Sequence, residues 1–126
     1  MTRDQLVALA IKPHFANVDR KHLDAAMDCF HDKTMLTVRT AFATHAGHAA
    51  LQRMSMDYFG AFETIIHRNF TCTVAENNGR IAACFVTNPL TADGQKTLPE
   101  NSSFRRVRGD RCQEVQDYMS AANPLV

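Results

Sequence analysis

The sequence predicts an α+β domain in which the helices come first and an antiparallel sheet follows. In the first half of the chain, apolar residues recur at helical spacing, as Leu6, Leu9 and Ala10 do. After residue 68 the chain is typical of strands and turns, with a hairpin signal at Asn77-Asn78-Gly79. Helices followed by a run of strands indicate an α+β fold with the helices on one face of the sheet.

Three helices are predicted. Thr2 and Gln5 form a capping box at the start of the first helix, which we expect to kink or end near Lys12 because Pro13 follows. Asp19 is predicted to cap the second helix, and a third covers about residues 48–63. The second helix has the apolar stripe Leu23, Ala26, Met27 and Phe30, and the third has Leu51, Met54, Tyr58 and Phe62, with Phe59 beside them.

Strands are predicted before and after the third helix. Residues 34–40 form the first strand, and a turn at residues 44–47 leads into the third helix. Residues 69–76 should pair with residues 80–88, because Asn and Gly accept the positive φ of the tight turn between them. Further turns at residues 92–95 and at Gly109-Asp110 precede a last strand over 111–119, so the final four strands form an antiparallel meander.

The composition is that of one ordinary globular domain covering residues 1–126, with 45% hydrophobic and 21% charged residues. The formal net charge is +1, from 14 basic and 13 acidic side chains, whereas a nucleic-acid partner would need a basic stripe. No apolar run approaches the roughly 18 residues of a membrane span. We therefore expect neither a nucleic acid nor a membrane as a partner.

The cysteines and histidines predict no metal site. The four cysteines are widely spaced and form no CxxC pair: Cys29, Cys72, Cys84 and Cys112. We interpret them as buried thiols, and because no signal peptide is visible we expect a cytoplasmic protein. His45 and His48 lie three residues apart, but no third ligand follows at a suitable spacing. We expect no metal and no other cofactor.

Asp117 is the leading candidate for a catalytic residue. It lies on the last predicted strand, where its same-face neighbours Val115 and Met119 are apolar. Burial against an apolar wall disfavours the charged carboxylate and raises its pKa, which suits a general base that removes a proton next to a carbonyl. Two alternatives stay open: Asp117 pairs with an arginine such as Arg106, or it faces solvent because the strand register differs by one residue.

Four short motifs occur in the order expected for one known superfamily. They are Phe30-His31-Asp32, Gly47-His48-Ala49-Ala50-Leu51, Phe104-Arg105-Arg106-Val107-Arg108-Gly109-Asp110 and Glu114-Val115-Gln116-Asp117-Tyr118. Together they resemble the nuclear-transport-factor-2-like (NTF2-like) superfamily, and within it the SnoaL-like branch of small polyketide-cyclase relatives. The resemblance implies a cone-shaped fold, in which a curved antiparallel sheet wraps a cavity that three helices close.

The resemblance leaves the activity open, because function resides in sites rather than in folds. Relatives include ketosteroid isomerase, scytalone dehydratase, limonene-epoxide hydrolase and polyketide cyclases, together with non-catalytic binding and dimerisation modules. The resemblance also implies a homodimer formed by the outer face of the sheet. Its interface residues would then be Tyr118, Glu114 and Arg105.

The resemblance implies roles for particular positions. The base of the isomerase falls at Val38, its oxyanion tyrosine at His14 and its second aspartate at Ser102, so none of the three residues is kept. Asp117 lies where SnoaL-type cyclases carry their acid/base aspartate. The implied cavity wall consists of Val115, Asp117 and Met119; Ser102, Phe104 and Arg106; Ala83, Phe85 and Thr87; and Met54, Tyr58 and Phe62.

His14 and Tyr58 are the candidate partners of Asp117. His14 could donate to a developing oxyanion or orient a water, or it could be a helix histidine bonded to backbone or water. Tyr58 could supply a hydroxyl, or it could hold that hydroxyl at the surface. His67, which begins a predicted strand, could reach the cavity mouth.

Three functions are compatible with these residues. The first is a cofactor-free enzyme that moves protons on a small hydrophobic carbonyl compound, by isomerisation, dehydration or aldol closure, with Asp117 as base. The second is a protein that binds a small hydrophobic molecule in the same cavity without chemistry. The third is a structural dimer module, which should show no cavity larger than a few waters.

Overall fold

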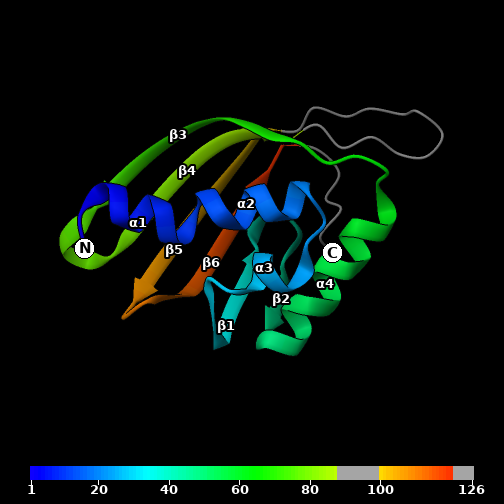
Figure 1. Ribbon diagram of the computed structural model, residues 1–126, viewed down its shortest axis with the longest axis horizontal. Helices are drawn as coiled ribbons and strands as arrows, with labels where there is room; N and C mark the ends of the chain where they lie inside the picture. The colour runs from blue at the N-terminus through cyan, green and yellow to red at the C-terminus, as the bar shows by residue number, and fades with distance from the viewer. Residues whose placement is uncertain (88–99, 121–126) are drawn as a thin grey trace.

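The computed structural model describes residues 1–87 and 100–120, which form a curved six-stranded sheet and the helices packed on it. The helices are α1 (Arg3–Ala10), α2 (Lys12–Asp19), α3 (Leu23–Met27) and α4 (His48–Ala61). The strands are β1 (Phe30–Val38), β2 (Ala43–Ala46), β3 (His67–Ala75), β4 (Arg80–Thr87), β5 (Glu100–Arg108) and β6 (Arg111–Met119). Figure 1 shows α1 and α2 lying across one face of the sheet, with α4 beside its β1 and β2 end.

The sheet has the strand order β2-β1-β6-β5-β4-β3. The predicted meander is present, because β3, β4, β5 and β6 pair antiparallel in sequence order. Two features were not predicted: β1 pairs parallel with β6, and residues 44–46 of the predicted turn belong to strand β2, which pairs with β1. The predicted turn at residues 92–95 lies outside the described residues. The α+β class is confirmed.

The first two helices meet at Pro13. The capping box of α1 forms as predicted, because Thr2 Oγ1 accepts from the Gln5 backbone N–H and the Gln5 side chain accepts from the Thr2 backbone. The helix ends at Ala10, and a further helix, α2, starts at Lys12 with Pro13 in its first turn. Proline is tolerated there because the first-turn N–H groups have no intrahelical partner.

The prediction that Asp19 caps the next helix was wrong. Asp19 is the last residue of α2, and α3 begins after His22, which makes no side-chain cap. The Asp19 carboxylate binds His67 instead, at the start of β3. Helix α3 also stops at Met27, three residues earlier than the apolar stripe suggested, since Phe30 already begins β1.

Buried apolar side chains fill the space between the helices and the inner face of the sheet. Leu6 and Phe15 of α1 and α2 pack on Ile81 and Phe85 of β4. A second cluster joins the sheet to α3 and α4 through Met27, Leu36, Val38, Leu51 and Val115. A pocket lined partly by polar side chains lies on the same inner face.

Candidate functional site

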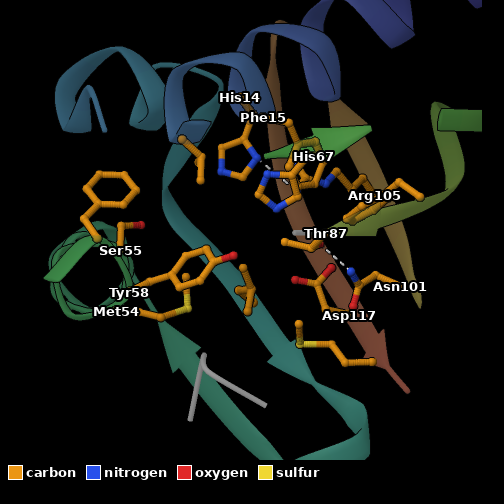
Figure 2. Close-up of a pocket in the computed structure, with 15 residues that line it drawn as sticks. His14, Phe15, Met54, Ser55, Tyr58, His67, Thr87, Asn101, Arg105 and Asp117 are labelled. Carbon is orange, nitrogen blue, oxygen red and sulfur yellow. Dashed lines mark hydrogen bonds between the residues drawn. The ribbon is translucent and has the colours of Figure 1, made fainter. Parts of the chain in front are cut away.

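The central pocket is formed by side chains of α2, α4 and every strand except β2 (Figure 2). Its lining residues are His14, Phe15, Val18, Leu36, Met54, Ser55, Tyr58, Phe59, His67, Phe85, Thr87, Asn101, Arg105, Asp117 and Met119. The wall is mostly apolar, with a few polar groups that converge on one space. Small-molecule sites usually have this character.

The three predicted catalytic residues meet in this pocket. Asp117, His14 and Tyr58 all line it, although they come from β6, α2 and α4. The predicted wall residues Met54, Phe85, Thr87 and Met119 line it as well. The pocket therefore brings together His14 and six of the twelve predicted wall residues.

Six other predicted wall residues do not line the pocket. Ala83 of β4 is 1% exposed and belongs to the apolar core beneath α1 and α2. Val115 is 1% exposed and belongs to the apolar core behind it. Phe62 follows α4 and packs its ring against Tyr58, with 5.4 Å between ring centroids. Ser102, Phe104 and Arg106 point to the opposite face of the sheet and line hollows there.

The prediction for β5 was wrong by one residue. Ser103 lies directly opposite Asp117 in the β5–β6 pair, and residues directly opposite each other point to the same face. The inward residues of β5 are therefore Asn101, Ser103 and Arg105, which are at most 6% exposed. A shift of one position moves every side chain of a strand to the other face. Arg105 is consequently buried and is not an outer-face interface residue.

Asp117 lies in a setting that favours its protonated form. Its Oδ1 atom is shielded from solvent and has no hydrogen-bond partner among the described residues. Burial raises the pKa of Asp117, while the charge of Arg105, a hydrogen bond from Ser103 and the charge of His67 lower it less. The predicted alternative of a pair with Arg106 is wrong, since Arg106 lies on the outer face and contacts Glu114 at 3.7 Å.

Arg105 is the buried cation of the site. Its guanidinium is 4.7 Å from the ring centroid of Phe15, close enough for a cation–π contact. It donates to the backbone carbonyl of Ala10 at 2.7 Å and to Ser103 Oγ at 3.0 Å, and it lies 3.2 Å from His14 Nδ1. Burial of an arginine without such acceptors would be strongly unfavourable.

His14 is held beside this cation. Its ring lies edge-on to Phe15 and Phe30, at 4.9 Å between centroids in both cases. Burial, and then the charges of Arg105 and His67, hold the pKa of His14 well below its usual value of 6.5. The imidazole is therefore neutral at physiological pH.

His67 is held by Asp19. Its Nδ1 is 2.5 Å from Asp19 Oδ1, and its backbone N–H donates to Asp19 Oδ2 at 2.9 Å. A carboxylate can only accept, so Nδ1 of His67 carries a proton and Nε2 is the ring nitrogen left for other contacts. A carboxylate that orients a histidine in this way is a recurring arrangement for general bases.

Tyr58 completes the polar side of the pocket. Its side chain projects from α4 toward the space between the two histidines and Asp117 (Figure 2). Burial and the charge of Asp19 raise the pKa of Tyr58, so its hydroxyl keeps its proton and can donate a hydrogen bond. The alternative of a surface hydroxyl is excluded, since the residue is 6% exposed.

The pocket is small. The centre of a water-sized sphere can occupy about 50 Å³ of it. A single water needs roughly 10–15 Å³ on this measure, so the pocket has room for a few waters. Drug-sized ligands occupy pockets of roughly 300 Å³ or more.

Among residues 1–87 and 100–120, no group of three or more His, Cys, Asp or Glu side chains is placed to hold a metal ion. All four cysteines are free thiols, but only Cys29 and Cys112 are buried, so the interpretation as buried thiols was wrong for the half-buried Cys72 and the exposed Cys84. Of the helices in the described part of the chain, none is both long and apolar enough to cross a membrane.

Sequence reasoning placed Arg105 on the wrong face and missed the contact between Asp19 and His67, although it expected His67 near the cavity mouth and His67 does line the pocket. Arg105 follows directly on the residue assigned inward, so the error in register hid it. Asp19 and His67 are 48 residues apart, and the acidic residue before a helix indicated a cap instead. Pairing Asp117 with Ser103 in the predicted meander would have identified the inward residues of β5.

Comparison with known proteins identifies the fold. No protein-family model matches the sequence, and no curated protein matches it. A candidate polyketide cyclase from Xanthomonas campestris pv. campestris has a TM-score of 0.81 at 17% identity, over 92% of this chain and 90% of that one. A candidate SnoaL-like polyketide cyclase from Shewanella putrefaciens CN-32 has a TM-score of 0.79 at 9% identity, over 91% and 79%.

A third similar structure is a Catenulispora acidiphila DSM 44928 protein with a ketosteroid isomerase-like fold, solved in complex with trimethylamine. Its TM-score is 0.77 at 14% identity, over 93% of this chain and 86% of that one. At such identities a likeness shows the fold alone. The chain has the NTF2-like cone fold, and the predicted resemblance to SnoaL-like and ketosteroid isomerase-like proteins is confirmed at that level.

Proposed function

We propose that this protein is a cofactor-free enzyme that transfers protons on a small hydrophobic carbonyl compound. The observation that carries the proposal is the convergence of Asp117, His14 and His67 on one apolar pocket. Burying a carboxyl whose Oδ1 has no partner among the described residues is unfavourable, and such groups cluster at functional sites. Structural neighbours described as candidate cyclases and as isomerase-like support the reaction class.

The roles follow from the protonation states. In its ionised form Asp117 takes a proton from the carbon next to the carbonyl and returns it to another position of the ligand, and its raised pKa makes this carboxylate a stronger base than an exposed one. Neutral His14 and the Tyr58 hydroxyl donate hydrogen bonds to the oxygen on which negative charge develops. Neutral His67, oriented by Asp19, serves through Nε2 as a second proton acceptor in the same pocket.

The pocket volume restricts the ligand to a compact molecule. Met54 and Met119 both line the pocket, and methionine side chains adapt their shape more easily than branched or aromatic ones. We expect these two residues to move when a larger ligand binds. The apolar wall provided by Leu36, Phe59 and Phe85 selects a hydrophobic molecule.

The same volume supports a second candidate, a non-catalytic binding or dimerisation module. Space for only a few waters is what we expected of a structural module. None of the three positions aligned with the isomerase residues keeps its residue, since they are His14, Val38 and Ser102. In this case Asp117 would be neutral and would contribute only to the shape of the pocket.

We further propose a homodimer formed by the outer face of the sheet. Phe104 and Tyr118 form an exposed aromatic pair there, with 5.7 Å between ring centroids. The neighbouring Arg106 and Glu114 carry opposite charges, so a two-fold interface can place the Arg106 of each subunit near the Glu114 of the other. The four free thiols support a location in the reducing cytoplasm.

A ligand screen by thermal shift tests the proposed function. Small ketones and enones, with bulkier polyaromatic hydroxy-ketones for comparison, are added to the wild type, to Asp117→Asn and to Asp110→Asn, an exposed control on the turn between β5 and β6. If the protein is the proposed enzyme, a ligand should stabilise the wild type and the control but not Asp117→Asn. The wild type should then turn this ligand over, and Asp117→Asn should not. Equal stabilisation of all three proteins would favour the binding module, and no shift from any compound would favour the structural one.

A further inference from the structure

We propose that Arg105 is a positioning residue that fixes His14 as the neutral tautomer protonated at Nε2. The pocket would then offer a permanent N–H donor at this point and select ligands that place a hydrogen-bond acceptor there. The statement about the tautomer rests on contacts within the protein. The statement about the ligand rests in addition on the function proposed above.

The N–H groups of Arg105 determine which tautomer His14 adopts. A guanidinium has five N–H groups and no acceptor, so any hydrogen bond between Arg105 Nη2 and His14 Nδ1 must run from the arginine to the histidine. The accepting Nδ1 therefore carries no proton. A neutral imidazole has one N–H, which must then be at Nε2.

The guanidinium cannot easily turn away from this contact. Arg105 is 3% exposed, and its other donors are bound to the Ala10 carbonyl and to Ser103 Oγ. All three acceptors, counting His14 Nδ1, are neutral groups on α1, β5 and α2. The three contacts together leave the plane of the guanidinium little freedom, as is typical of a buried arginine with several fixed acceptors.

The same aromatic side chains hold both partners. The guanidinium lies over the rings of Phe15 and Phe30, at 4.7 and 5.8 Å from their centroids. The His14 ring lies edge-on to those two rings. A ring flip of His14 would place a carbon where Nδ1 now accepts, leaving a buried guanidinium N–H without a partner, at the desolvation penalty of such a group.

The positive charges around His14 act in the same direction as the hydrogen bond. Burial disfavours a second proton on the ring most, followed by the charge of Arg105 on β5 and, when its own ring is protonated, that of His67 on β3. Asp117 on β6 and Tyr58 on α4 line the same pocket, and both favour their neutral forms. His14 therefore stays a single donor rather than becoming a cation, and protonation at Nδ1 would break its bond to Arg105.

The consequence is a selection rule for the ligand. A carbonyl, enolate or phenolate oxygen can accept from His14 Nε2–H, whereas a group that only donates cannot. Donor groups of a ligand would instead meet the acceptor side of the pocket, where Asp117 lies. A site built to hydrogen-bond one group rejects analogues that lack it, because its own polar atoms are then left unpaired.

The test is the tautomer of His14 in the ligand-free protein, observed by two-bond ¹H–¹⁵N correlation spectra of ¹⁵N-histidine-labelled samples. We expect His14 to show a bare Nδ1 and a protonated Nε2. We also expect the pattern to persist at about pH 5.5, where an ordinary imidazole of pKa about 6.5 is mostly protonated. A protonated Nδ1 at neutral pH would overturn the proposal, whatever the ligand screen gives.

Two substitutions at Arg105 establish that this residue is the cause, with Arg106→Met as the matched control on the outer face of the same strand. Arg105→Met should shift the Nδ1 resonance of His14 and allow the ring to protonate at higher pH. Arg105→Lys, which keeps a cationic donor, should retain the bare Nδ1. If Arg105→Met does not fold, the spectra of wild type and Arg105→Lys decide the question. A His14 Nδ1 resonance in Arg105→Lys that equals that of free histidine in solution would contradict the assignment.

The two proposals fail separately. If His14 Nδ1 is bare and hydrogen-bonded, but Asp117→Asn does not alter the thermal shift caused by any ligand, the role of Arg105 stands and the proposed enzyme is rejected. If a ligand stabilises the protein only when Asp117 is present, but His14 Nδ1 is protonated, the proposed enzyme stands and the role of Arg105 is rejected.

Discussion

His67 Nδ1 lies 2.5 Å from Asp19 Oδ1, and this contact joins the end of α2 to the start of β3. The second oxygen of the same carboxylate accepts from the His67 backbone N–H. The side chain of His67 is 5% exposed, whereas that of Asp19 is 25% exposed. The pair therefore connects the pocket wall to a carboxylate that still has contact with solvent.

Asp19→Asn should destabilise the protein and release the ring of His67. The amide keeps the size of the carboxylate, but it lacks the charge and has only one acceptor oxygen for two hydrogen bonds. Bonds to charged groups contribute about 1.5–3 kcal/mol each, so we expect the free energy of unfolding to fall by about 1–3 kcal/mol in chemical denaturation. Asp57→Asn, at an exposed position of α4, is the control and should change it by less than about 0.5 kcal/mol. Equal stability of Asp19→Asn and wild type would show that the contact is weak in solution.

Asp117→Asn should stabilise the protein at neutral pH and not in acid. The pKa of Asp117 is raised in the folded state, so between its unfolded value of 3.8 and its folded value the folded protein binds more protons than the unfolded chain. Stability is then lost as the pH rises through that window, because the buried carboxyl must ionise. Replacing it by a neutral amide removes this loss.

The measurement is the melting temperature of wild type and Asp117→Asn from about pH 3.5 to pH 8, with the exposed Asp110→Asn as control. The advantage of Asp117→Asn should grow as the pH rises above the unfolded pKa of 3.8 and then level off. A constant difference between the two proteins over the whole range would mean that the carboxyl of Asp117 titrates normally.

Local signals in the sequence were sufficient for most of the fold. The capping box of Thr2 and Gln5 and the hairpin turn at Gly79 depend on neighbouring residues, and both are present. Pairings between distant segments were not accessible in the same way. The parallel pairing of β1 with β6 joins residues about 80 apart, and no local pattern encodes it.

The same difference between local signals and long-range contacts decided which residues of the candidate site were predicted. Asp117 was found because an acidic residue interrupts an apolar strand face, which is a local pattern. Arg105 was assigned to the wrong face because its strand contains polar residues at both parities, so alternation gave no register. Its contacts with Ala10 and His14 span more than 90 residues, and only the folded chain shows them.

Phe104→Ser should weaken the proposed homodimer. Phe104 is 47% exposed on the outer face, beside Tyr118, and removing its ring removes apolar area from the proposed interface. Sedimentation velocity over a concentration series should show a dimer for the wild type and a larger monomer fraction for Phe104→Ser. Phe42→Ser is the matched control, since Phe42 is 95% exposed after the short turn before β2. A monomeric wild type, or equal effects of the two substitutions, would contradict the proposed interface.

Gly79→Ala should destabilise the protein more than Gly109→Ala, although both glycines lie in tight turns and have positive φ, of 62° and 64°. A side chain in this region costs about 1–2 kcal/mol at either position. At Gly79 the added Cβ would also lie 2.6 Å from the carbonyl oxygen of Val107, whereas at Gly109 it would meet nothing within 4 Å. The backbones cannot separate freely, because Val107 N–H donates to the Gly79 carbonyl at 2.8 Å. Chemical denaturation of the two variants measures the difference, and equal losses would mean that the turn between β3 and β4 relaxes around the new methyl group.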